Sequence, residues 1–287
     1  MRKLFVCIAL GLTTLTGNAA SPLWMRDVQI SPDGTEIAFC YKGDIYKVSA
    51  GGGTAIQLTT QPSYECTPIW SPDSKQIAFA SDRNGNFDIF VMPATGGTAQ
   101  RLTTHSSSEL PSTFTPDGKY ILFSASIQDP SQSALFPTTA MTELYKVPVN
   151  GGRTEQVLGT PAEAVCYAPS GEFLLYQDRK GFEDEWRKHH TSSITRDIWL
   201  YDTKTGKHTN LTNHAGEDRN PVLSPDGKSV YLLSERKGSF NVYSFPLDNA
   251  QDLKAVTSFK THPVRFLSMS HGGTLCYAYD GEIYTQK

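Results

Sequence analysis

A four-residue turn, Ser-Pro-Asp-Gly or a close variant, recurs along this chain, and an apolar segment follows each copy. Proline presets φ at the second position of a type I turn, aspartate bonds its local backbone, and glycine accepts a positive φ. The copies begin at residues 31, 71, 115, 168, 224 and 270, which gives separations of 40, 44, 53, 56 and 46 residues. A repeat of this length, filled with strands, is typical of a β-propeller blade. The repeat therefore predicts an all-β fold, a six-bladed β-propeller.

Each repeat contains the elements of a four-stranded blade. A first strand runs into the turn, as at Thr67–Trp70 and Pro221–Leu223, two apolar strands follow, and a fourth ends in a Leu-Thr-Thr-like tail. The second and third strands are apolar almost throughout, as expected where neighbouring blades cover both faces. A helical interpretation fails because β-branched and aromatic residues dominate and Gly or Pro interrupts the segments. The predicted blades cover approximately residues 25–60, 66–104, 111–160, 163–213, 219–258 and 264–287.

The sixth unit is incomplete in this sequence. Its third strand begins at Glu282-Ile283-Tyr284, and the sequence ends at Lys287 without a fourth strand. An unpaired strand would leave an exposed sheet edge, which proteins normally avoid. We therefore expect a propeller whose last blade is incomplete, and we expect the natural polypeptide to continue. The alternative is that something unusual covers this edge.

The first 20 residues have the features of a secretory signal. Arg2-Lys3 precedes an apolar run over residues 4–10, and Gly17-Asn18-Ala19-Ala20 offers small residues for cleavage. The apolar run is too short to span a membrane as a stable helix. We expect residues 1–20 to be a signal peptide and residues 21–287 to form one domain, periplasmic or secreted, with no membrane span.

Charge and cysteine content narrow the choice of partners and of covalent links. Removal of the leader leaves 24 basic and 29 acidic residues, so no basic face is implied and nucleic acid is not an expected partner. Four cysteines remain, at positions 40, 66, 166 and 276. Cys40 aligns with Ala80 and Cys276 with Ala38, which favours small buried residues. A disulfide stays open, and spacing alone cannot choose among three pairings.

Two units carry insertions between their second and third strands, over residues 127–142 and 179–195. In a propeller this hairpin opens on the same face as the connections between blades. Neighbouring insertions would therefore build a wall beside the central channel. Function concentrates on such loops.

The sequence has no motif that assigns catalysis, a metal or a cofactor to this chain. The stretch Asp82–Asp88 superficially resembles a calcium loop, but its glycine and its missing glutamate do not fit an EF-hand. The related stretches at Asp178-Arg179 and Glu235-Arg236 favour a repeated hairpin turn with a structural acid–arginine pair.

Four consecutive residues of the second insertion, Arg187, Lys188, His189 and His190, are the candidate peptide-binding residues. Two cations on a channel rim could hold a carboxylate, the arginine through its bidentate fork. The alternative is pairing with the acids of residues 183–185. Metal binding by the histidines is disfavoured, because adjacent residues of an extended segment point in opposite directions and no third ligand is evident.

The repeated pattern resembles the TolB-like, WD40-like propeller repeats. The insertion, from Glu185 to Ser193 and on through Thr195–Asp202, is similar to the first propeller of tricorn-like proteases. That resemblance implies a six-bladed propeller followed by a seven-bladed propeller, a PDZ domain and a serine peptidase domain of the S41 type. It also implies that a basic pair, here Arg187-Lys188, anchors the C-terminus of the substrate. No catalytic residue is carried over to this chain.

These observations lead to three hypotheses. The first is a non-catalytic propeller segment of an exported tricorn-like serine protease, which gates and positions peptides for proteolysis. The second is a stand-alone periplasmic TolB-like scaffold for protein interactions, and the third is a propeller that binds a carbohydrate or another ligand in its funnel. The first implies peptides or unfolded protein segments as partners, together with further domains of the same polypeptide.

Overall fold

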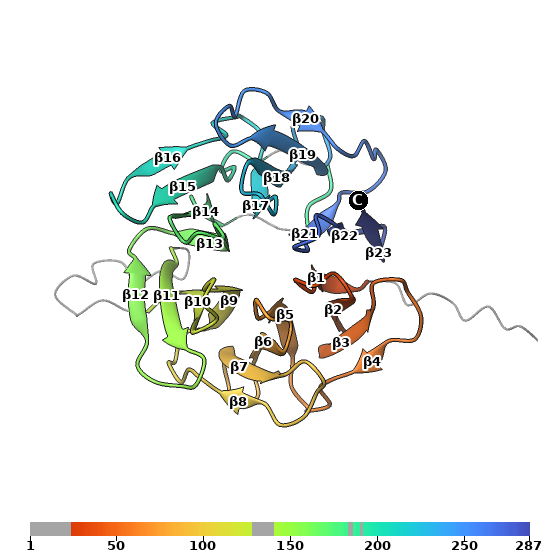
Figure 1. The fold of residues 1–287 in the computed structure, drawn as a ribbon, viewed down its shortest axis with the longest axis vertical. Helices are drawn as coiled ribbons and strands as arrows, with labels where there is room; N and C mark the ends of the chain where they lie inside the picture. Colours follow the sequence, from red (N-terminus) through yellow and green to blue (C-terminus); the bar gives the residue numbers. More distant parts are fainter. Residues whose placement is uncertain (1–23, 128–140, 183–185, 190–191) are drawn as a thin grey trace, which may run out of the picture.

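The computed structural model describes residues 24–127, 141–182, 186–189 and 192–287. These residues form 23 strands in six separate sheets, arranged around a central axis, and they contain no helix (Figure 1). Five sheets have four strands and the sixth has three. The predicted six-bladed propeller with an incomplete last blade is confirmed. The expected signal peptide lies outside the described residues.

The strands follow one another in chain order from blade to blade. They are β1 (Arg26–Ile30), β2 (Glu36–Tyr41), β3 (Asp44–Ser49) and β4 (Ile56–Gln57) in blade 1; β5 (Glu65–Trp70), β6 (Gln76–Ser81), β7 (Asp88–Pro93) and β8 (Gln100–Arg101) in blade 2; β9 (Glu109–Phe114), β10 (Tyr120–Ala125), β11 (Glu143–Pro148) and β12 (Glu155–Leu158) in blade 3; β13 (Ala162–Tyr167), β14 (Phe173–Asp178), β15 (Ile198–Asp202) and β16 (His208–Asn210) in blade 4; β17 (Asp218–Leu223), β18 (Ser229–Ser234), β19 (Asn241–Pro246) and β20 (Lys254–Ala255) in blade 5; and β21 (Arg265–Met269), β22 (Leu275–Tyr279) and β23 (Glu282–Gln286) in blade 6.

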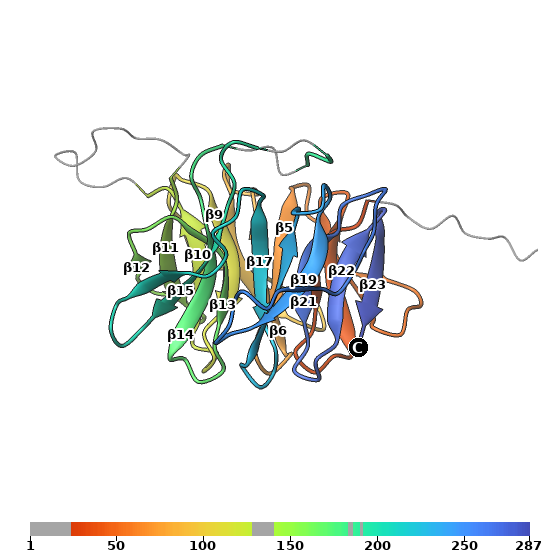
Figure 2. The same ribbon diagram turned by 90° about the horizontal axis from the view of Figure 1, so that it is seen from above.

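Every blade is an antiparallel meander in which consecutive strands pair. The first strand of each blade lies beside the central channel, and the last strand lies at the periphery (Figure 1). Seen from the side, the blades stand upright around the channel, and the described parts of the loop after β14 lie at one end of the ring (Figure 2). The repeated turns therefore lie at the opposite end from this loop.

The repeated turn is held by hydrogen bonds from its own side chains. Ser31 Oγ donates to Asp33 Oδ1 at 2.5 Å, and Asp33 Oδ1 also accepts from the N–H of Thr35 at 2.9 Å. The Ser31 hydroxyl accepts in turn from the N–H of Glu36 at 3.0 Å. The copies at residues 71, 115 and 224 repeat these bonds. The hydrogen bond from Ser31 lowers the pKa of Asp33, since it favours the charged form.

The threonine of the Leu-Thr tail has a defined structural role as a hydrogen-bond acceptor. In blade 1 its hydroxyl, on Thr59, accepts from the buried N–H of Ile45 at 2.9 Å. Equivalent bonds link Thr103 to Ile89, Thr212 to Ile198 and Thr257 to Val242, each at 2.9 Å. The tail therefore fastens the end of a blade to the start of its third strand.

The hydrophobic core is divided into six clusters, one at each seam between neighbouring blades. Residues 77–80 of β6 are completely buried, because blades cover both faces of that strand. The cysteines at positions 40, 66 and 276 are buried and the one at 166 is half-buried, and all four are free thiols. The prediction of small buried residues holds for the first three.

Blade 6 closes the ring against blade 1. Val28 and Phe39 of blade 1 pack with Cys276 of blade 6 in one cluster. The N–H of Ile30 donates to Ser268 Oγ at 3.1 Å across this seam. Apolar packing and hydrogen bonds thus join the two ends of the ring.

The first strand of every blade contains a bulge at the same place. In five blades the bulge includes a residue with positive φ, namely Asp27, Thr67, Ala164, Asn220 and Phe266. A bulge interrupts the pairing ladder and re-aims side chains. Side chains at this level consequently line the channel.

Candidate functional site at the channel mouth

The central channel widens into a cavity at each end. The cavity on the side of the insertions has a volume of about 620 Å³, and the cavity on the side of the repeated turns has a volume of about 600 Å³. Four residues line both cavities and so form the waist between them: Gln29, Ser112, Ala164 and Asn220. The channel is a large concave feature of the described residues and a natural place for a ligand.

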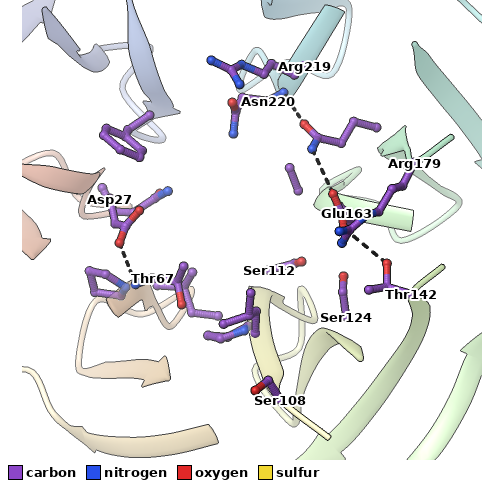
Figure 3. A pocket seen from close by; sticks show the side chains of 18 of the residues that line it. Asp27, Thr67, Ser108, Ser112, Ser124, Thr142, Glu163, Arg179, Arg219 and Asn220 are labelled. Carbon is purple, nitrogen blue, oxygen red and sulfur yellow. Dashed lines mark hydrogen bonds and ion pairs between the residues drawn. The ribbon is translucent and has the colours of Figure 1, made fainter. Parts of the chain in front are cut away.

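The mouth on the insertion side is charged, and a network centred on Glu163 shapes one wall of it (Figure 3). Arg179 Nη1 lies 2.8 Å from Glu163 Oε1, and Thr142 Oγ1 donates to the same oxygen at 3.3 Å. Gln177 Nε2 donates to Glu163 Oε2 at 3.4 Å, and Gln177 Oε1 accepts from the N–H of Asn220 at 3.0 Å. This chain of bonds connects the start of the second insertion to the waist.

The hairpin arginines do form structural ion pairs, and their partner acids lie on the first strand of the same blade. The pairs are Arg83 with Glu65, Arg179 with Glu163, and Arg236 with Asp218. The acid beside the first arginine, Asp82, instead accepts a hydrogen bond from the N–H of Tyr64 at 2.7 Å. Each arginine thus holds the inner strand of a blade to its hairpin.

Blade 3 lacks this arginine, because Ile127 stands where blade 2 has Arg83. Its acid, Glu109, is 1% exposed and lies below the loop of serines that lines the mouth. Burial raises the pKa of Glu109 to about 7, and the nearby Asp88 carboxylate contributes to the shift. The arginine at this seam, Arg101, lies 2.8 Å from Asp88 Oδ2. Two buried acids therefore share one cation.

The predicted anchor Arg187 is buried and engaged by carboxylates. Its Nη2 lies 2.6 Å from Glu217 Oε2, and its Nη1 bonds Glu235 Oε2. Its guanidinium also stands over the ring of Phe240, 5.2 Å from the centroid. All three partners belong to the first half of blade 5 and its hairpin. Arg187 therefore docks the blade 4 insertion onto the neighbouring blade.

The residues on either side of Arg187 reach the seam between blades 6 and 1. The ring of Trp186 contacts two guanidinium groups, with Arg26 at 4.4 Å and Arg265 at 5.0 Å from its ring centroid. Trp186 and Lys188 line a cavity of about 290 Å³ at this seam, which also includes Phe266. Trp186, Arg265 and Phe266 line the channel mouth as well, so these three residues lie where the two cavities adjoin.

Two of the remaining predicted site residues, Lys188 and His189, lie on the surface. Lys188 is exposed and makes no hydrogen bond or ion pair with any residue that the structure describes. His189 is exposed too, with Nδ1 3.4 Å from the carbonyl oxygen of Gly238. His190 and the acids at 183–185 lie outside the described residues. Peptide binding by these residues stays a prediction.

Sequence reasoning did not single out Arg26, Arg219 and Arg265. The strand register places all three at the same position of the first strand, in blades 1, 5 and 6. An alignment of the repeats would have shown three arginines at one shared position of the first strand. All three belong to the insertion end of the channel, where they contribute positive charge.

The family of tricorn protease N-terminal beta propeller domains matches residues 22–287. The chain belongs to this family. Its fold agrees with the crystal structure of the tricorn protease, with a TM-score of 0.76 and 22% identity over 92% of this chain. The match covers 25% of that protein, so this chain spans a quarter of the tricorn protease.

Other relatives share parts of this tricorn-type propeller. TolB from Acinetobacter baumannii has the same fold, with a TM-score of 0.62 and 18% identity over 86% of this chain and 57% of that one. The uncharacterized peptidase YuxL of Bacillus subtilis (strain 168) is 32% identical over 72 residues, which are 25% of this chain and 10% of YuxL. The described residues include no helix long and apolar enough to cross a membrane.

Proposed function

We propose that this chain is the non-catalytic propeller segment of an exported tricorn-like serine protease of the S41 type. In this proposal the propeller gates and positions peptides, and a peptidase domain elsewhere in the same polypeptide cleaves them. The observation that carries the proposal is the family match over residues 22–287. The channel supports it, because a cavity at each end of a common waist offers a path for an extended chain.

Within this proposal, Lys188 anchors the C-terminal carboxylate of a peptide. Lys188 is the exposed cation of the predicted pair, and it lines the seam cavity beside Arg26 and Arg265. Arg187 supports it as a positioning residue, since its ion pairs to Glu217 and Glu235 fix the segment that carries Lys188. His189 and His190 flank the anchor.

The anchor is tested by calorimetric binding of matched peptides with a free C-terminal acid or a C-terminal amide. Lys188→Ala should weaken the binding of the free-acid peptide by about fivefold, which is the upper range for an exposed ion pair. The affinity for the amidated peptide should stay unchanged. Lys228→Ala, at an exposed turn on the other end of the ring, is the matched control and should change neither. Equal losses for acid and amide would refute the anchor.

The larger claim is tested with the product of the full coding sequence. Ser112→Trp, which narrows the waist, should lower kcat/KM for long peptides more than for short ones. Export is tested by fractionation, with the protein expected in the periplasm or the medium. A product that hydrolyses no peptide would instead favour the stand-alone scaffold.

A further inference from the structure

The waist of the channel presents two side-chain amides that have no hydrogen-bond partner in the described part of the chain. They belong to Gln29 of β1 and Asn220 of β17, and both are partly exposed. Hydrogen bonds to neighbouring side chains hold their backbones. The carbonyl of Gln29 accepts from Trp70 Nε1 at 3.0 Å, and the N–H of Asn220 donates to Gln177. The backbones of both residues are therefore held at the channel wall, while their side-chain amides keep their polar atoms available within the described part of the chain.

A side-chain amide offers both donors and an acceptor. A peptide group offers one donor and one acceptor, whatever side chain it carries. Ser112, with a hydroxyl, and Ala164, with only a methyl group, complete the waist. The chemistry of the waist thus matches the main chain of an extended polypeptide, and no charge there selects a side chain.

The cavity on the turn side is poor in charge, and His271 is the one histidine among its described lining residues. No Asp, Glu, Lys or Arg is among the residues that line it, whereas five such residues line the opposite mouth. The nearby turn aspartates, such as Asp33 and Asp73, are bonded to their own turns. Prolines of five turns and the side chains of Trp70 and Phe114 form much of the wall. A charged side chain would lose hydration here without gaining a carboxylate, a lysine or an arginine as its partner.

We propose that the waist and the turn-side cavity bind an extended, uncharged polypeptide segment through its main chain, with Gln29 and Asn220 as the hydrogen-bonding pair. The inference rests on the proposed function, since it states how the channel holds the peptide that passes through it. Charged residues of the bound peptide would then lie in the insertion-side mouth, and its uncharged residues would occupy the turn-side cavity.

The probe is an N-acetylated, C-amidated peptide of about eight uncharged residues, which spans about 26 Å when extended. Because one hydrogen bond contributes about 0.5–1.5 kcal/mol, Gln29→Ala or Asn220→Ala should weaken binding by about 2- to 10-fold. Gln61→Ala, an exposed glutamine outside the channel, is the matched control and should not change it. Thermal unfolding of each variant should match the parent, since neither amide has a partner among the residues that the structure describes.

A second peptide isolates the main-chain contact. N-methylation of its central peptide groups removes the N–H donors, so the parent protein should bind it more weakly than the unmodified probe. The variant lacking both amides should discriminate less between the two peptides. A central Asp or Lys should also weaken binding to the parent protein. Equal affinity of parent and amide variants for the unmodified probe overturns the inference, as does equal affinity of the parent for the methylated peptide.

The outcomes separate this inference from the proposed function. If free-acid peptides bind through Lys188 while the uncharged probe does not bind, the main-chain site is wrong and the peptide-positioning function stands. If neither kind of peptide binds, the proposed function fails together with the inference.

Discussion

Arg187 of the blade 4 insertion and Glu217 of blade 5 form a buried ion pair, with Nη2 of the arginine 2.6 Å from Oε2 of the glutamate. The side chains are 4% and 0% exposed. Glu217 also forms an ion pair with Arg196, with Arg196 Nη1 3.0 Å from Glu217 Oε1, so the glutamate joins the insertion to the residues just before β15. These ion pairs therefore attach the blade 4 insertion, which lies at the channel mouth, to blade 5.

Replacement of Arg187 by Met should destabilise the protein by about 3 kcal/mol, because Glu217 and Glu235 would lose a buried cation. Urea unfolding measures the change. Lys188→Ala, the next residue, is exposed and should stay within about 0.5 kcal/mol of the parent. The pair is not structural if the two substitutions have equal effects.

Replacement of Thr59 by Val should cost about 1–3 kcal/mol of unfolding free energy. The substitution keeps the shape of the side chain but removes the acceptor for the N–H of Ile45, which stays buried. Thr60, the next residue of the same tail, is exposed, and Thr60→Val should be nearly neutral. Chemical denaturation of both variants checks the prediction, and a neutral Thr59→Val contradicts the fastening role of the tail.

The blades could be predicted from the sequence because their signals are local. Ser31, Asp33 and the glycine after them close a turn within a few residues; three further copies repeat its side-chain bonds, and all six copies share the backbone bond that closes the turn. The apolar strands follow from burial on both faces. The role of Thr59 was not predictable, although the tail was visible, because its bond reaches a strand 14 residues earlier.

The channel mouth could not be predicted, because it depends on register and on loop paths. The strand expected at Thr67–Trp70 begins at Glu65, since a bulge at Thr67 breaks the pattern that marks a strand. The partner of Arg83 therefore lay outside the predicted strand. Trp186 meets arginines from two blades that are distant in sequence, which no local pattern encodes.

Replacement of Ser74 by Gly should stabilise the protein by about 0.5–1 kcal/mol. Ser74 has φ 61°, a left-handed conformation that costs a residue with a Cβ about 1 kcal/mol. Its hydroxyl accepts only one exposed bond, from the N–H of Asp33 at 3.2 Å. The reverse change in another copy, Gly227→Ser, should destabilise by about 1 kcal/mol, since the new Cβ meets nothing within 4 Å and only the backbone resists. Thermal unfolding should shift in opposite directions, and shifts of the same sign contradict the argument.

Glu109, the acid of blade 3 that has no hairpin arginine, should make stability depend on pH. The pKa of Glu109 in the folded protein is about 7, above its usual 4.5, so the folded state binds the proton more tightly than the unfolded state. Its stabilising contribution is complete below about pH 4.5, falls as the pH rises towards about 7, and is lost above that.

Glu109→Gln keeps the side chain neutral and should remove this part of the change in unfolding free energy with pH. Ile127→Arg should also remove it, because it adds the cation that Arg83 supplies in blade 2. Urea unfolding across this range tests the claim, and it fails if the parent and Glu109→Gln curves run parallel.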